Sequence, residues 1–137
     1  MKFTTKYTLA LQILCICHLY ADQKITSNFI AEKTGADSSL IRYTMLDLKK
    51  KNYISSRPGP GGTTLSEDIS KITLFDVYEL VSDPNDSILK FNELPPSATS
   101  LDIGINESIQ KSFEDIKQEM FTKMKQTTIL DICKEIN

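Results

Sequence analysis

The sequence predicts a mainly α-helical protein with one small β-hairpin and a long helix near the C-terminus. Apolar residues recur at three- and four-residue steps through most of the chain, which is the spacing of amphipathic helices. One run of glycine and proline, over 58–62, separates two short stretches rich in β-forming residues. Towards the C-terminus, an apolar stripe over 105–125 follows a stretch rich in proline, asparagine and serine. The length of 137 residues therefore fits one compact domain with an appended element.

Three short helices are expected in the first fifty residues. The first covers 4–21, the second covers 26–35 and ends at a glycine, and the third begins at Asp37 or Ser38 and continues to about Lys51. Small polar residues stand at each start, where their side chains can accept hydrogen bonds from free backbone N–H groups. Two short helices joined by a tight, glycine-containing turn are the sequence form of a helix-turn-helix.

A β-hairpin is expected directly after this helix pair. Residues 53–57 and 63–66 form its strands, and the glycines and prolines of 58–62 form a tip that allows the backbone to approach another surface closely. Arg57 stands at the base of this tip. A hairpin in this position is a wing, so residues 1–82 are expected to form a winged helix-turn-helix domain.

A helix over 73–81 completes this domain, and a connecting or effector loop over 83–104 follows. Residues 105–137 are expected to hold a long helix, starting at Ile105 or Asn106, and a short terminal helix. The long helix carries a nearly heptad-like apolar seam of Ile105, Ile109, Phe113, Ile116, Met120 and Met124. This seam either packs on its own domain or forms half of a two-fold interface. We favour a homodimer, because the preceding domain can already close its own core.

The composition excludes several classes of protein. Hydrophobic residues make up 40% of the chain, which is too much for a disordered protein. No apolar run approaches the roughly 20 residues that span a bilayer, no secretory cleavage site follows the first helix, and three cysteines are too few for a disulfide scaffold. We therefore expect a cytoplasmic protein that does not bind membranes.

The net charge of −2 is unevenly distributed. Residues 1–64 carry nine Lys or Arg against four acids, whereas residues 65–137 carry seven Lys against fourteen acids. A basic first half is typical of a protein that binds a polyanion such as DNA. The alternative is a scatter of charges over a solvated surface.

Several motifs recur in a defined order along the chain. They are MKFTTK at 1–6, LAL at 9–11, IT at 25–26, IAE at 30–32, LKKKNYI at 48–54, GPGG at 59–62 and ITLFDV at 72–77, with IG at 103–104 and TILD at 128–131 further on. Together they resemble the Rrf2 (Rrf-two) family of bacterial winged helix-turn-helix transcription factors, which includes the iron–sulfur cluster regulator and the cysteine-metabolism repressor. The resemblance implies a sequence-specific DNA-binding regulator, a repressor, that acts as a homodimer on a palindromic operator.

The chain departs from this family in two regions. In the wing, Arg57 stands one place earlier than the family arginine, Pro58 takes its place, and Thr63-Thr64 replace an aromatic residue. In the loop before the long helix, the family carries the cysteines of its iron–sulfur cluster, but this chain has no cysteine between its second and its third, and Leu101 takes the place of the first. A cluster needs three or four thiolates or substitutes held together, so we expect a member without a cluster or other cofactor.

In this class of protein the third helix enters the major groove of DNA. Its apolar stripe leaves Arg42, Tyr43 and Leu46 facing outward, and Arg42 is the first candidate to read a guanine, because a guanidinium donates two hydrogen bonds to guanine O6 and N7. The alternative for Arg42 is a surface ion pair with Asp37 or Asp47. Polar side chains at helix starts suit phosphate oxygens, or are ordinary caps. The candidate DNA-contacting residues are Thr4, Thr5, Lys6, Ser27, Asn28, Ser38, Ser39, Arg42, Tyr43, Lys49, Arg57, Gly59, Pro60 and Gly61.

The cysteines and the single histidine form no metal or catalytic motif. Cys15 and Cys17 project roughly 200° apart on one helix, so they do not chelate one ion. The simplest interpretation is that all three cysteines, Cys15, Cys17 and Cys133, are small core residues. The alternative is a redox sensor in which Cys133 forms a disulfide with a cysteine of the first helix. His18 has no convergent partners in the sequence.

Two other functional classes compete with a DNA-binding regulator. An enzyme is not expected, because the sequence offers no nucleophile with a base, no carboxylate pair at meaningful spacing and no phosphate-binding loop. A dimeric protein-interaction module that keeps the winged-helix fold without specific DNA binding remains the alternative. The acidic second half and the altered wing favour it. The small-molecule or oxidant effector stays unassigned.

Overall fold

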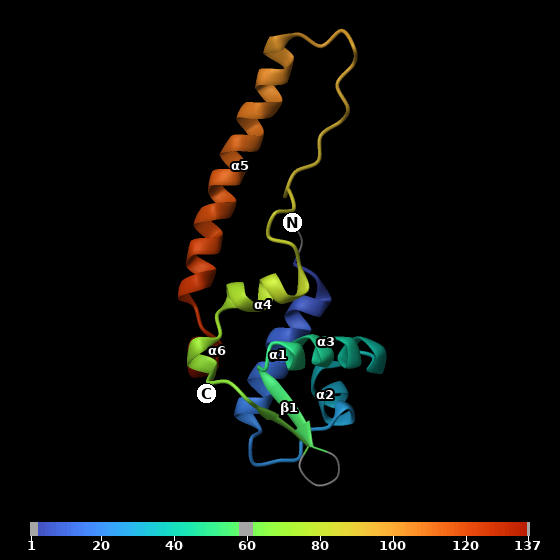
Figure 1. Ribbon diagram of the computed structural model, residues 1–137, viewed down its shortest axis with the longest axis vertical. Coiled ribbons are helices and arrows are strands. Elements are labelled where there is room, and N and C mark those ends of the chain that lie inside the picture. The colour runs from blue at the N-terminus through green and yellow to red at the C-terminus, as the bar shows by residue number, and fades with distance from the viewer. Residues whose placement is uncertain (1–2, 58–61, 137) are drawn as a thin grey trace.

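Figure 1 shows the computed structural model of the protein, which describes residues 3–57 and 62–136. A helical body carries a β-hairpin at one end and a long helical arm at the other. The elements are α1 (Thr5–Leu19), α2 (Ser27–Thr34), α3 (Ser38–Lys50), β1 (Ile54–Arg57), β2 (Gly62–Leu65), η2 (Ile69–Lys71), α4 (Leu74–Val81), α5 (Ser100–Gln126) and α6 (Ile129–Lys134). These helices, together with one two-stranded antiparallel hairpin, confirm the predicted fold class. Within the described ranges, no helix is both long and apolar enough to cross a lipid bilayer.

The first three helices start at polar side chains that cap them. Thr4, Thr26 and Asp37 each accept a hydrogen bond from the backbone N–H three residues further on, over 2.8–3.2 Å. α2 ends at Gly35, whose φ of 76° is a left-handed conformation that glycine adopts without strain. These caps determine where α2 begins and ends and where α3 begins, so the two helices form the predicted helix-turn-helix.

α1 runs through the centre of the core. Its side chains Leu9, Ile13 and Leu14 are at most 1% exposed, and the helix packs against α2, α3, α4 and α6. The hydroxyl of Tyr7 donates a hydrogen bond to the backbone carbonyl of Leu74 on α4 over 2.8 Å. Each fully buried aliphatic side chain stabilises the fold by roughly 1.5–3 kcal/mol, so the packing of α1 contributes strongly to the stability of the core.

The hairpin is held against the connection between α1 and α2. β1 and β2 pair antiparallel, with Arg57 opposite Gly62, so the return strand begins one residue before the predicted 63–66. The backbone N–H of Thr63 donates to the carbonyl of Ile25 over 2.8 Å. Gly62 has a φ of 62°, and a Cβ atom there would lie 3.0 Å from the backbone nitrogen and oxygen of Ile25. Glycine is therefore required at 62 both by conformation and by space.

Replacing Gly62 with alanine is expected to lower the free energy of unfolding by about 1–3 kcal/mol, because the left-handed conformation becomes strained and the new Cβ meets the backbone of Ile25. Urea denaturation of the variant measures this loss. Gly104→Ala is the matched control: a Cβ at that position in α5 meets nothing within 4 Å, and alanine should stabilise the helix by about 0.5–1 kcal/mol. A Gly62→Ala protein with the denaturation midpoint of the parent would contradict the strain at this position.

The long helix begins earlier than predicted. The sequence predicts a start at Ile105 or Asn106, after a loop over 83–104, but the first helical residue of α5 is Ser100. The connecting loop therefore ends at Thr99, and the helical arm is more than one turn longer than the apolar seam alone indicates.

A capping box explains the earlier start of α5. The hydroxyl of Thr99 accepts a hydrogen bond from the N–H of Asp102 over 3.2 Å, and the carboxylate of Asp102 accepts one from the N–H of Thr99 over 2.9 Å. These two bonds satisfy backbone donors that a helix start would otherwise leave free. Gly104 lies inside the first turns and costs roughly 1 kcal/mol relative to alanine, which the capping box offsets.

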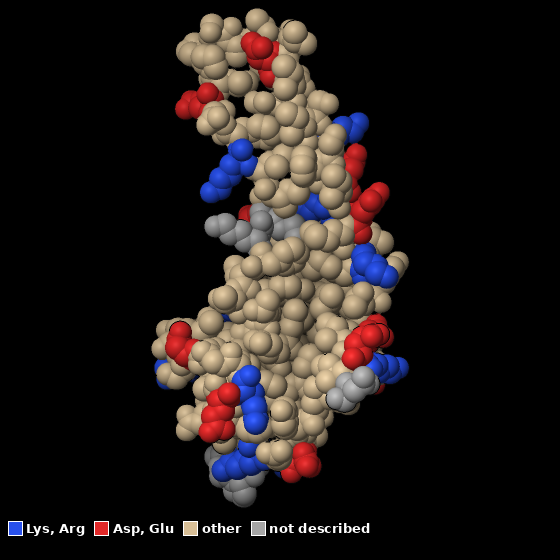
Figure 2. Space-filling view, turned by 180° about the vertical axis from the view of Figure 1, so that it is seen from behind, with Lys and Arg blue, Asp and Glu red and all other residues tan. Residues whose placement is uncertain are grey.

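The apolar seam of α5 divides into a buried and an exposed part. Near the body, Phe121 and Met124 are buried, and the rings of Phe121 and Phe75 lie 4.9 Å apart. This differs from the prediction that placed Met124 in a dimer interface, because Met124 is 7% exposed within its own chain and Met120 packs partly against the same core. Four members towards the tip are 39–55% exposed, namely Ile105, Ile109, Phe113 and Ile116. Figure 2 shows charged side chains of both signs along the outer edge of α5.

The loop before α5 is fastened to the arm by polar contacts. Lys117 on α5 is 2% exposed, and its ammonium donates to the backbone carbonyl of Asp86 over 3.3 Å and pairs with Glu114 at 3.0 Å. Further along, the side-chain amide of Gln110 donates to the hydroxyl of Ser87 over 3.2 Å. The chain therefore rises beside α5 before it turns back into that helix (Figure 1).

The base of the arm is joined to the body through the backbone. The N–H of Leu74, at the start of α4, donates to the carbonyl of Thr127, and the N–H of Ile129 donates to the carbonyl of Ile72, both over 2.9 Å. α6 then packs against α1 and η2. The junction between α5 and α6 is thus held by hydrogen bonds as well as by apolar packing.

Candidate nucleic-acid interface

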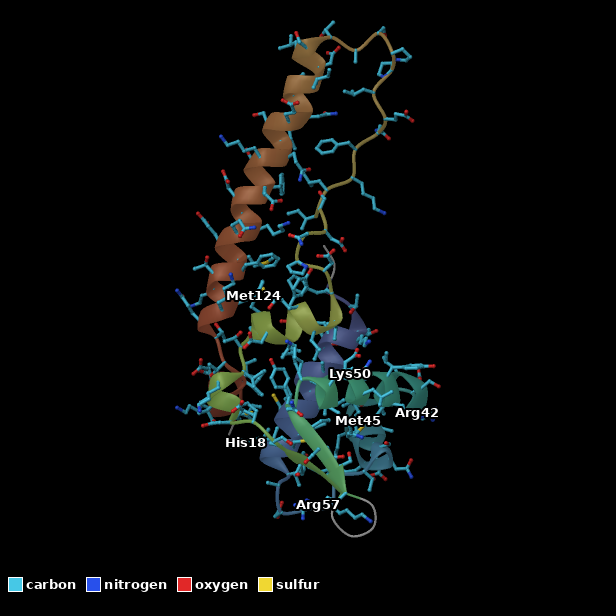
Figure 3. All side chains as sticks on the ribbon, viewed as in Figure 1. His18, Arg42, Met45, Lys50, Arg57 and Met124 are labelled. Carbon is cyan, nitrogen blue, oxygen red and sulfur yellow. The ribbon has the colours of Figure 1, made fainter. Side chains whose placement is uncertain are left out.

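A hollow of about 300 Å³ lies between α3, the hairpin and the segment that precedes α2. Four cationic side chains line it, Lys24, Arg42, Lys49 and Arg57, and no acidic side chain is among its described lining residues. We call it the basic hollow. Figure 3 shows Arg42 on α3 and Arg57 at the end of β1. Positive charge gathered from three separate segments makes this surface suited to a polyanion.

The burial of α3 decides which of its side chains reach the surface. Ile41 and Leu48 are fully buried, as the apolar stripe predicts. On the outer side Arg42 is exposed, and Tyr43 and Leu46 are 62% and 46% exposed. Two outward side chains of the helix, one cationic and one apolar, therefore border the basic hollow one turn apart.

The ion pairs expected to compete for Arg42 do not form among the described residues. Asp47 pairs with Lys6 of α1 instead, and the carboxylate of Asp37 accepts a hydrogen bond from the N–H of Leu40 over 2.8 Å. The guanidinium of Arg42 is therefore available to a ligand. The same pairing engages Lys6, which the sequence predicts to contact phosphate.

Lys24 belongs to the site, although it is not among the residues that the sequence predicts to contact DNA. The hydrogen bond between Thr63 and Ile25 draws the segment before α2 alongside β2, and Lys24 is thereby placed at the edge of the basic hollow. Gly62 is the residue in the sequence that indicates this contact, because a position that only glycine can occupy implies that another backbone segment lies close to it. The sequence does not state which segment that neighbour is.

The remaining predicted contact residues take different positions. Ser27 lines the basic hollow, and Asn28, Ser38 and Ser39 are exposed in the first turns of α2 and α3. Thr5 is exposed at the start of α1. Thr4 caps α1 and lines a different hollow, together with Tyr78 and the loop before α5. Three of the predicted residues, Gly59, Pro60 and Gly61, lie outside the described part of the chain.

The three cysteines form two groups. Cys17 is buried in α1, and this burial raises its pKa to about 12. Cys15 faces α6, where burial and then the neighbouring Cys133 thiol raise the pKa of Cys15 to about 12. The packing of α6 on α1 therefore brings Cys15 and Cys133 together and leaves Cys17 apart. His18, near the end of α1, is exposed.

The residues present do not fit an iron–sulfur cluster. Leu101, 74% exposed in the first turn of α5, stands where the family that the motifs resemble has its first cluster cysteine. The cysteines of this chain lie in α1 and α6. Over residues 3–57 and 62–136, no three His, Cys, Asp or Glu side chains converge on one point. No step of the function is therefore assigned to iron.

Comparison with known proteins relates the whole chain to transcriptional regulators. Residues 3–135 match the family described as Rrf2, iron-dependent transcriptional regulator. YwnA of Bacillus subtilis (strain 168), described as a candidate HTH-type transcriptional regulator, is 23% identical over 132 residues, which cover 96% of this chain and 97% of YwnA.

Two solved structures show the same fold. IscR of T. potens superposes with a TM-score of 0.71 at 19% identity, over 100% of this chain and 89% of IscR. CymR (YrzC), the global cysteine regulator of B. subtilis, superposes with a TM-score of 0.66 at 16% identity, over 100% of this chain and 99% of CymR. The wing, the helix pair and the long helix of this chain are therefore parts of one shared architecture.

Proposed function

Because the chain belongs to the Rrf2 family of transcriptional regulators, we propose that it is a cytoplasmic, homodimeric repressor that binds a two-fold symmetric DNA operator through the basic hollow. The observation that carries the proposal is the gathering of Lys24, Arg42, Lys49 and Arg57 around α3 and the wing. In a helix-turn-helix protein the second helix of the pair enters the major groove, and its first residues meet the base edges. A repressor of this kind acts by occupying its operator.

The exposed part of the α5 seam supports the homodimer. Ile105, Ile109, Phe113 and Ile116 lie on one side of a helix that stands away from the body, and each is at least 39% exposed. Exposed apolar side chains in such a row are typical of an interface with another chain. A two-fold axis at α5 would present two α3 helices to successive turns of one duplex, roughly 34–36 Å apart, which is why we propose a palindromic operator.

Selection from a random-sequence DNA library with the purified protein tests the proposal. The expected result is enrichment of a palindrome whose half-sites are separated by about one helical turn. A protein that enriches no sequence and binds no duplex at low salt would favour the alternative, a dimeric protein-interaction module with a winged-helix fold.

Replacing Lys49 with alanine is expected to weaken binding to all DNA sequences alike. Each phosphate contact contributes about 0.9 to the slope of log affinity against log salt, so the loss from both protomers should lower that slope by about 1.8. Titrations at several salt concentrations measure it. Lys33→Ala is the control, because it removes the same charge from α2 outside the basic hollow, where the Lys33 ammonium lies 5.2 Å from the ring centres of Tyr20 and Phe29. Equal slopes for the parent and Lys49→Ala would remove Lys49 from the DNA contact.

We also propose a thiol response, favoured by the proximity of Cys15 to Cys133. In this step each thiol loses one proton and one electron, a sulfur–sulfur bond forms, and an oxidised glutathione disulfide is reduced to two glutathione thiols. The thiolate is the attacking species, and the raised pKa of Cys15 leaves little of it at neutral pH.

The disulfide is therefore expected to form slowly at pH 7 and faster as the pH rises towards the Cys15 pKa of about 12. Mass spectrometry of oxidised protein should find Cys15 joined to Cys133 and Cys17 still reduced. Cys133→Ser should abolish the product, and Cys17→Ser should leave it unchanged. Full alkylation of Cys15 after prolonged exposure to oxidised glutathione at pH 9 would contradict the thiol response.

A further inference from the structure

The floor of the basic hollow is apolar, although cations surround it. Ile25 and Met45 are 1% and 6% exposed there, and Leu46 borders the floor with 46% of its surface exposed. The hydroxyl of Ser27 donates a hydrogen bond to the sulfur of Met45 over 3.9 Å. Ile25 and Met45 belong to the hydrophobic core, so Leu46 is the apolar side chain of this floor that a ligand can reach. Phosphate oxygens bind to hydrogen-bond donors and positive charge, so contact with the DNA backbone does not account for an exposed leucine at this point.

We infer that Leu46, with Met45 behind it, reads the 5-methyl group of a thymine in the operator. The inference rests on the proposed DNA-binding function and adds a base identity to it. In the major groove thymine differs from the other bases by its O4 acceptor together with its methyl group, and apolar side chains contact that methyl. The four cations place this apolar floor against a polyanion rather than against an apolar protein partner.

The position of Leu46 on α3 also indicates which thymine it reads. Leu46 follows Arg42 by four residues, so both side chains project from the same face of the helix. Four residues advance about 6 Å along a helix axis, and successive base pairs are about 3.4 Å apart. The thymine is therefore expected about one or two base pairs from the guanine that Arg42 is proposed to read.

The test uses the full-length protein and the duplex that DNA selection enriches. Each thymine and its symmetry mate are replaced in turn by deoxyuridine, which lacks the 5-methyl group and keeps the same pairing edge. At one thymine pair the affinity should fall about fourfold for each half-site, or about fifteenfold for the symmetric duplex, which is the effect of no longer burying one methyl group per site. Thymines elsewhere should tolerate the change.

Variants of Leu46 assign the effect to this side chain. Leu46→Ala should bind the thymine and deoxyuridine duplexes equally, whereas Leu46→Met keeps an apolar contact and should still prefer thymine. Leu19→Ala is the matched control, because Leu19 on α1 is 44% exposed, lies outside the basic hollow and should leave the preference of the parent unchanged. Thermal melting followed by circular dichroism confirms that each variant is folded.

Two results separate this inference from the proposed function. If the duplex binds but every deoxyuridine substitution is silent, or if the preference for thymine persists in Leu46→Ala, Leu46 does not read thymine and the DNA-binding proposal stands. If selection enriches no duplex, the DNA-binding proposal fails and the reading of thymine fails with it.

Discussion

Replacing Arg42 with alanine is expected to weaken binding to the selected operator by about 1–3 kcal/mol for each half-site and to abolish the preference for guanine at one position. The guanidinium lies at the edge of the basic hollow, on the outer side of α3, and forms no ion pair with the described residues. Without it, the O6 and N7 atoms of that guanine lose two hydrogen bonds at once. Titrations against duplexes that carry each of the four base pairs at this position measure the effect.

Arg42→Lys separates the reading of a base from simple attraction between charges. Lysine keeps the positive charge but does not offer the planar pair of donors that matches guanine. The Arg42→Lys variant should therefore retain the salt dependence of the parent while its preference for guanine decreases. An Arg42→Ala protein that ranks the four base pairs as the parent does would show that another side chain reads the guanine.

Replacing Ile109 with aspartate is expected to convert the proposed homodimer into monomers at micromolar concentration. Ile109 is 41% exposed in the middle of the apolar row on α5, and a carboxylate there would be buried without a partner in a symmetric interface. Because two linked half-site contacts bind far more tightly than one, operator affinity should fall by about 10²–10⁴-fold. Sedimentation equilibrium and DNA titration measure the two effects.

Lys111→Asp is the control for the dimer prediction. Lys111 lies two residues from Ile109, roughly 200° around the helix, so the same carboxylate is added on the opposite side of α5. This variant should remain dimeric. A monomeric parent, or an Ile109→Asp protein that stays dimeric with full operator affinity, would contradict an interface along the exposed seam.

Local signals in the sequence predict most of the fold correctly. Thr4, Thr26 and Asp37 cap the helices as expected, and Gly35 ends α2, because these features depend on residues within one turn of each other. Arg42 faces outward for the same reason, since the period of the apolar stripe on α3 determines it.

Features that depend on distant segments are harder to predict. The apolar seam of α5 reads as one stripe in the sequence, but Phe75 of α4 packs against Phe121 near the C-terminal end of α5, so Met124 belongs to the core of its own chain. Lys24 joins the basic hollow through a hydrogen bond between segments that are far apart in the sequence. The start of α5 is different, because the pair Thr99 and Asp102 is a local signal that outweighs the glycine at 104 in the first turns of the helix.

The hydrogen bonds between 72–74 and 127–129 fix the angle at which α5 leaves the body. With 27 residues, α5 is a helix about 40 Å long. If its base were a hinge, a tilt of about 5° would move the far end by about 3.5 Å, close to the rise of one base pair. In a homodimer joined along α5, such a displacement would shift the two α3 helices out of register with successive turns of the duplex. In the proposed homodimer, these hydrogen bonds would therefore preset the separation of the two α3 helices before the protein contacts any base pair.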